Sequence, residues 1–205
     1  MARLPRVHLP GVLYYVTQQG VQDRPLFRDS EDYQTYLDLL AQYKTKHEFK
    51  IFGWALNEDK IHLLVEPYGQ VTISEIMRDL TSRYSKFSNG RYGGTGSLFK
   101  GRFHNVMVEK EMFLIQSMRW VRAMKDCSAV VANSMVDFQK GLRGEIKEVV
   151  AVTGAGADIP FLNLLTPMNG EEQEIFSQKL KEPVIGSKDF VMKVRAHISG
   201  ASVKV

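Results

Sequence analysis

Hydrophobic and polar positions alternate along residues 12–124 with two different periods, which together predict four strands and three helices. Strands are expected where β-branched and aromatic residues cluster between turn signals, over residues 12–17, 49–56, 60–66 and 103–108. Helices are expected where apolar residues recur at helical spacing behind a capping residue, from Asp29 or Ser30, over 72–87 and over 109–124. The order of these elements predicts an α+β fold, a ferredoxin-like βαββαβ sandwich with one added helix.

Short polar segments predict where the elements begin and turn. The capping-box sequence Thr72-Ile73-Ser74-Glu75 is expected to open the second helix. The link Asn57-Glu58-Asp59 is short and polar, so the strands on either side of it are expected to form an antiparallel hairpin. Residues 89–96 carry four glycines and are expected to form a flexible loop, and their spacing matches neither phosphate-binding glycine pattern.

The periodic pattern weakens after residue 130, which divides the chain into a domain over residues 1–130 and an extension over residues 131–205. Residues 151–170 are rich in glycine, proline and small side chains and are expected to form an irregular arm. Two short helices are expected over residues 171–180 and 187–198, separated at Pro183 and Gly186. The extension is therefore predicted to be mostly irregular, with some helix.

Composition restricts the expected cellular location of the protein more than its function. Hydrophobic residues make up 44% and charged residues 24% of the 205-residue chain, as is usual for a protein with a buried core. No apolar run reaches the length of a transmembrane helix, and no apolar stretch of a secretory signal follows the N-terminus. The single cysteine, Cys127, excludes an internal disulfide and a thiolate metal cluster. A cytoplasmic protein with no membrane partner is expected.

Positive charge is concentrated in one segment. Residues 78–102 hold six cations and one acid, a net charge of +5, whereas the whole chain carries +4. Tyrosine and phenylalanine residues are interleaved with these cations, a combination that suits phosphates and unpaired bases. A solvated helix face followed by a glycine-rich loop is the alternative interpretation of the same segment.

A second candidate site is the strand sequence Asp59-Lys60-Ile61-His62. Side chains alternate along a strand, so Lys60 and His62 face the same side of the sheet. Two histidines at this spacing could share a divalent cation, but the lysine ammonium offers no lone pair. His62 is expected to be a hydrogen-bonded or phosphate-contacting residue, and Lys60 either contacts a phosphate or lies exposed at the hairpin edge.

Several stretches in this order resemble the HUH-type single-strand transposases, in particular the REP-associated tyrosine transposases. The resemblance rests on residues 9–16 (LPGVLYYV), 54–65 (WALNEDKIHLLV), 94–103 (GTGSLFKGRF), 119–121 (RWV) and, more loosely, 184–190 (VIGSKDF). Members of that family are dimers that bind DNA hairpins and cut a nearby single strand. A tyrosine attacks the phosphate, and two histidines and a polar residue on the tyrosine's helix hold the metal.

Carried over position by position, this resemblance predicts a degenerate catalytic site. Lys60 stands at the first histidine, Trp120 at the nucleophile and Met124 at the polar residue of the helix, and only His62 is retained. We therefore expect a catalytically inactive, nucleoid-associated homodimer that binds hairpin or single-stranded DNA without a cofactor. Trp120 is expected to pack in the core, with stacking on a base as the alternative. The predicted DNA contacts are six cations: Lys60, Arg83, Lys86, Arg91, Lys100 and Arg102.

Two other functions stay open at this point. One is an active transposase or nuclease that uses Tyr84 or Tyr92, with Mg²⁺ or Mn²⁺ held by His62 and Glu66. Glu66 shares a strand face with His62 and is the nearest acid in the sequence. The other is a protein-interaction scaffold that keeps the fold without DNA affinity, for which the charge of residues 78–102 has no use.

Overall fold

The computed structural model of the protein describes residues 9, 11–124 and 166–199. Its elements in chain order are β1 (Leu13–Gln19), α1 (Ser30–His47), β2 (Phe49–Asn57), β3 (Lys60–Pro67), α2 (Ile73–Tyr92), β4 (His104–Val108), α3 (Lys110–Ala123), α7 (Gly170–Lys179), β5 (Val184–Ile185) and α8 (Lys188–Ile198).

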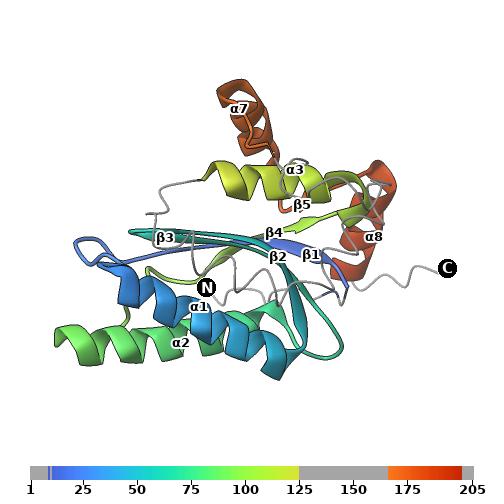
Figure 1. Cartoon of the computed structure of the whole chain (residues 1–205). Coiled ribbons are helices and arrows are strands. Elements are labelled where there is room, and N and C mark those ends of the chain that lie inside the picture. Colours follow the sequence, from blue (N-terminus) through green and yellow to red (C-terminus); the bar gives the residue numbers. More distant parts are fainter. Residues whose placement is uncertain (1–8, 10, 125–165, 200–205) are drawn as a thin grey trace, which may run out of the picture.

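One five-stranded sheet forms the middle layer, with the strand order β2-β3-β1-β4-β5. The pairs β1–β3, β1–β4 and β2–β3 are antiparallel, which is the ferredoxin-like arrangement predicted from the element order. Helices α1 and α2 cover one face of the sheet and α3 covers the other, with α7 beyond α3 (Figure 1). The expected α+β sandwich with an added helix is confirmed.

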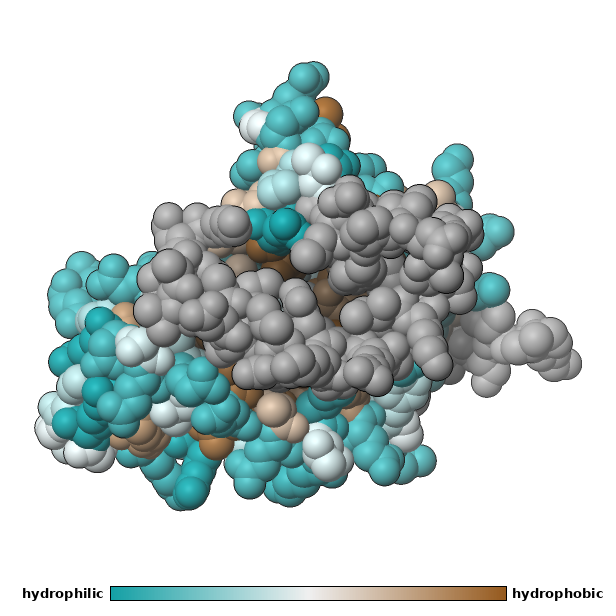
Figure 2. Space-filling view, viewed as in Figure 1, coloured by the Kyte–Doolittle hydropathy of each residue, from teal (hydrophilic) through white to brown (hydrophobic). Residues whose placement is uncertain are grey.

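The side-chain alternation of β1 separates two hydrophobic cores. Tyr14 and Val16 point into the core under α1 and α2, while Leu13 and Tyr15 point into the core under α3 and α7. All four of these side chains are buried. The outer surfaces of α1 and α7 in the view of Figure 2 are mostly hydrophilic.

Local capping explains where the two long helices begin. Asp29 caps α1 by accepting from the backbone N–H groups of Glu31 and Asp32. Thr72 and Glu75 form the predicted capping box of α2.

The prediction for residues 89–96 was wrong in its first half. Helix α2 continues through residues 89–92 and ends only at Gly93, whose φ of 65° is left-handed and suits glycine at a helix terminus. The helix is thus longer than the predicted 72–87. The low helix propensity of this glycine-containing segment is overcome because tertiary contacts of Asn89, Arg91 and Tyr92 hold the last turn.

The described part of the C-terminal extension packs on the first domain. The two predicted short helices are present as α7 and α8, and the strand β5 between them was not predicted. β5 pairs in parallel with the end of β4, with Met107 opposite Val184 and Val108 opposite Ile185. Residues 131–165, and the predicted arm up to residue 165, lie outside the described residues, as does Cys127. None of the described helices combines the length and hydropathy needed to cross a bilayer.

Candidate nucleic-acid interface and the face around His62

A buried chain of hydrogen bonds joins His62 to the predicted nucleophile position. The indole Nε1–H of Trp120 donates to Tyr15 Oη over 2.9 Å, and that hydroxyl lies 2.7 Å from His62 Nδ1. The three side chains come from α3, β1 and β3 and are 9%, 5% and 3% exposed. The fold therefore brings Trp120, which the resemblance places at the nucleophile position, close to His62, with a tyrosine between them.

The donors and acceptors in this chain define the protonation of His62. Indole nitrogen can only donate, so the arrangement that satisfies every group has Tyr15 donating to His62 Nδ1, with the histidine proton on Nε2. Burial, reinforced by the charge of Lys60, lowers the pKa of His62 to about 4. Burial also raises the pKa of the Tyr15 hydroxyl to about 12. The chain is neutral at physiological pH.

The described tail covers this chain from outside. The ring of Phe176 on α7 lies 5.7 Å from the ring of Trp120, centroid to centroid. Arg119 donates to Glu172 on α7 over 2.8 Å and to the carbonyl of Thr166 over 2.8 Å. Trp120 is thus packed between the sheet and the tail, as expected for a core tryptophan, and presents no free ring face to a base.

The residues around His62 do not fit the divalent metal that the resemblance implies. Lys60 has no lone pair to offer while charged, and Met124 at the end of α3 supplies only a soft thioether, a poor ligand for Mg²⁺ or Mn²⁺. Within residues 9, 11–124 and 166–199, no group of three His, Cys, Asp or Glu side chains could hold a metal ion. Glu66 is buried and accepts from Lys110 Nζ over 2.9 and 3.1 Å, so its charge is already balanced.

The two tyrosines considered as alternative nucleophiles lie across the sheet from His62. Tyr84 is fully buried in the core under α1 and α2, where its hydroxyl donates to the carbonyl of Leu26 over 2.6 Å. Tyr92 donates to Asp32 over 2.8 Å, and burial together with this carboxylate raises the pKa of Tyr92 to about 12. Because α2 and α3 cover opposite faces, neither hydroxyl can act with His62 on one phosphate.

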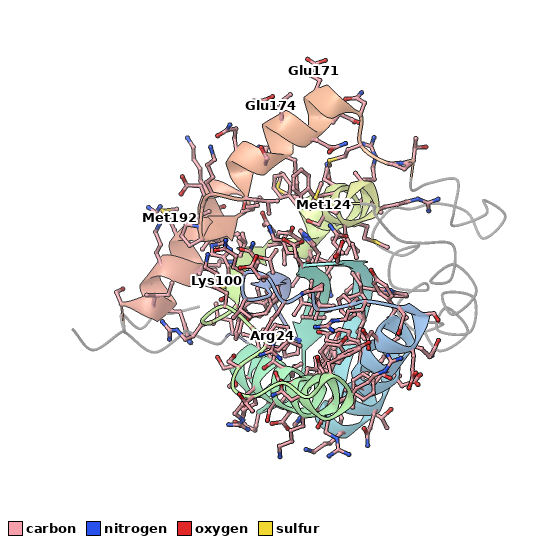
Figure 3. All side chains as sticks on the ribbon, turned by 90° about the vertical axis from the view of Figure 1, so that its left-hand side faces the viewer. Arg24, Lys100, Met124, Glu171, Glu174 and Met192 are labelled. Carbon is pink, nitrogen blue, oxygen red and sulfur yellow. The ribbon has the colours of Figure 1, made fainter. Side chains whose placement is uncertain are left out.

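Three of the predicted DNA contacts gather where β1 ends. Lys60 opens β3 opposite Gln19, and the backbone N–H of Lys100 donates to the carbonyl of Gln19 over 2.9 Å. Arg102 follows two residues later, before His104 opens β4. Figure 3 looks onto this end of the molecule, with Lys100 labelled. We call Lys60, Lys100 and Arg102 the sheet-end cations.

The remaining predicted contacts belong to α2, in a different layer. Arg83 and Lys86 are exposed on the second half of this helix, which runs toward the same end of the molecule (Figure 1). In the described part of the chain, neither they nor the sheet-end cations form an ion pair.

Arg91 differs from the other predicted contacts. Its guanidinium makes ion pairs of 2.7–2.8 Å with Asp29, Glu31 and Asp32, of which Asp32 is fully buried. Asp29 gains a lowered pKa, chiefly through the hydrogen bonds from Arg91. Arg91 ties the end of α2 to the start of α1, so we leave it out of the proposed DNA contacts.

Two residues important to these surfaces were missed from the sequence. Tyr15 looked like one of several apolar strand residues, and only its alternation relative to Tyr14 could have placed it on the His62 face. Arg24 lies in the segment after β1, where no periodicity is available. Its partners, Asn89 and Thr95, are more than 60 positions away in the chain.

Comparison with known proteins agrees with the fold described above. The family model of IS200-like transposases matches residues 20–113, which span most of the βαββαβ unit. This match supports the resemblance of residues 20–113 to the HUH-type transposases. A comparison with curated protein sequences finds no match.

Two solved structures are similar to this chain at low sequence identity. One is a REP-associated tyrosine transposase bound to a REP hairpin, 16% identical with a TM-score of 0.50, covering 59% of this chain and 70% of that one. Another, from Deinococcus radiodurans R1 and provisionally assigned as a transposase, is 12% identical with a TM-score of 0.40 and covers 69% of this chain and 98% of that one.

Proposed function

We propose that this protein is a catalytically inactive, transposase-like protein that binds hairpin or single-stranded DNA. The observation that carries the proposal is the buried chain from Trp120 through Tyr15 to His62. It occupies the place where the resemblance would require an accessible tyrosine and a metal. The protein has kept the fold but lacks the catalytic tyrosine and the metal ligands that the resemblance implies.

Neither Trp120 nor Tyr15 can replace the missing nucleophile. An indole nitrogen has no lone pair available to attack phosphorus, and the Tyr15 oxygen is buried and engaged on both sides. A pKa of about 12 leaves almost no Tyr15 phenolate at neutral pH. Loss of a covalent nucleophile removes many orders of magnitude in rate, and loss of the metal removes further stabilisation of the transition state.

The proposed DNA binding rests on cations that form no ion pair within the described residues. Side chains without an ion pair can exchange water and counterions for phosphates without first breaking an internal contact. Lys60 places a fixed positive charge on the His62 face, so DNA binding needs no divalent cation. The solved structure with a REP hairpin shows that a protein of this fold can bind such DNA.

The test is a binding titration with hairpin and single-stranded oligonucleotides, with EDTA or Mn²⁺, followed by denaturing gels. We expect a metal-independent shift that weakens steeply with salt, and neither cleavage nor a covalent adduct. K100Q and R102Q should each reduce the slope of log K against log salt by about 0.7–0.9. Lys193→Gln, on α8 at the far end of the sheet, is the matched control. Cleavage or an adduct with the wild type would refute inactivity, and salt-insensitive binding would refute the phosphate contacts.

A homodimer is part of the same proposal, because the family resemblance implies one. Light scattering behind size-exclusion chromatography, with and without hairpin DNA, measures the molar mass directly. A mass near twice 23.3 kDa supports the dimer, and a mass near 23.3 kDa in both conditions contradicts it.

A further inference from the structure

The loop after α2 is fastened to the rest of the protein by two side chains. Arg24 Nη2 donates to Asn89 Oδ1 over 2.7 Å, and Arg24 Nη1 donates to the carbonyl of Thr95 over 3.1 Å. Asn89 Nδ2 in turn donates to the carbonyl of Gly96 over 2.9 Å. These bonds connect the segment after β1, the last turn of α2 and the loop at Thr95 and Gly96, and we call them the Arg24–Asn89 clamp.

The clamp leaves no free space at its centre. A side-chain carbon added to Gly94 would collide with the Arg24 guanidinium and would lie 2.8 Å from Asn89 Oδ1. The backbone N–H of Gly94 also donates to the carbonyl of Asn89 over 3.1 Å. A side chain at position 94 would therefore have to displace the Arg24 guanidinium from its place against the loop.

Residues 98–100, which follow the clamp, lie along the end of β1. The N–H of Val21 donates to the carbonyl of Leu98 over 3.0 Å, and the N–H of Lys100 donates to that of Gln19 over 2.9 Å. Gly20 and Phe99 form an antiparallel bridge between these two bonds. The clamp lies next to this short ladder, which holds the backbone of residues 98–100 against the end of β1.

We propose that Arg24 and Asn89 are positioning residues, which hold residues 98–102 so that Lys100 and Arg102 are arranged for DNA before it binds. This inference rests on the proposed DNA-binding function. Two of the five N–H donors of Arg24 are bonded to Asn89 and Thr95, which ties its side chain to the loop, and the salt slope distinguishes this role from a phosphate contact. DNA binding to a preformed surface avoids the loss of conformational entropy that would accompany the ordering of a free loop.

The two kinds of residue have different signatures in a salt titration. Removing a phosphate contact lowers both the affinity and the salt slope, since one fewer counterion is released. Removing a positioning residue lowers the affinity and leaves the slope unchanged, because the same phosphates are contacted once the loop has been ordered. We expect Asn89→Ala and Arg24→Lys to weaken hairpin binding roughly tenfold without a change in slope.

The experiment compares four full-length variants with the wild type: N89A, R24K, R24Q and K100Q. R24K keeps the charge but loses the fork that bonds two partners at once. Amide hydrogen exchange at Val21 and Lys100, whose N–H groups bridge the two segments, should quicken in N89A and R24K while the strands of the sheet keep their protection. Circular dichroism identifies a variant that fails to fold, and R24K, the mildest change, then carries the test.

The outcomes separate this inference from the proposed function. Wild-type affinity in N89A and R24K, or unchanged exchange at Val21 and Lys100, would overturn the positioning role. A slope lowered by about one in R24Q would make Arg24 a phosphate contact instead. If the wild type binds no hairpin or single strand at low salt, the proposed function itself fails, and only then does the exchange measurement alone decide whether the clamp orders the loop.

Discussion

His62 should make the stability of this protein depend on pH in a predictable window. Its side chain is 3% exposed, and burial with the nearby Lys60 charge lowers its pKa to about 4, against about 6.5 in an unfolded chain. Between these pH values His62 is protonated in the unfolded chain and neutral in the folded protein. Stability is therefore complete above about pH 6.5 and is lost as the pH falls toward 4.

The size of this loss follows from the two pKa values. At 1.36 kcal/mol per pH unit, the difference between about 6.5 and about 4 corresponds to about 3 kcal/mol of unfolding free energy. Roughly 2.5 kcal/mol of it should be lost between pH 7 and pH 4.5. The structural cause is the burial of the imidazole beside the Lys60 charge, and an added proton on Nδ1 would also displace the hydrogen bond that Nδ1 accepts from Tyr15.

Urea unfolding at pH 7, 6, 5 and 4.5 measures this loss when His62→Gln is compared with the wild type. Glutamine stays neutral at all these pH values, and its amide oxygen can accept from the Tyr15 hydroxyl. The free-energy difference between the two proteins should therefore change by roughly 2.5 kcal/mol across the range, in the direction that favours H62Q in acid. His104→Gln removes an exposed histidine and serves as the control. Parallel curves for the wild type and H62Q would refute the buried neutral histidine.

Three further changes test other parts of the structure by the same unfolding measurement. Trp120→Phe keeps an aromatic ring but removes the N–H donor of the buried chain, and should cost about 1 kcal/mol, against about 3–5 kcal/mol for Trp120→Ala; wild-type stability in Trp120→Phe would show that the hydrogen bond contributes nothing. Gly186→Ala should cost roughly 1–3 kcal/mol, because the added carbon would lie 2.5 Å from the ring of Phe190, and Gly170→Ala, where nothing lies within 4 Å, is the matched control. Arg91→Ala leaves the fully buried Asp32 without its ion pair and should cost roughly 2 kcal/mol while the salt slope of DNA binding stays that of the wild type; a reduced slope would restore Arg91 to the DNA contacts.

Local patterns were enough to predict the βαββαβ unit. Strand alternation, the capping box at Thr72 and the short link at Asn57-Glu58-Asp59 each depend on residues close together in the chain, and each was found in the structure. The prediction failed at residues 89–92 and at β5. In both places the conformation is held by distant partners, such as the β4 backbone that pairs with Val184 and Ile185.

The sequence by itself determined which chemical groups stand at the positions that the resemblance assigns to catalysis, since residue identity alone excludes charged Lys60 as a metal ligand and Trp120 as a nucleophile. Only the tertiary structure decided what these positions do instead. Tyr15 joins Trp120 to His62 across 105 and 47 positions of sequence, and no local pattern encodes such contacts. The same holds for the cations, which look alike in sequence. Folding supplies carboxylates to Arg91 and leaves Lys100 exposed, because charge pairing depends on which segments the packed sheet and helices bring together.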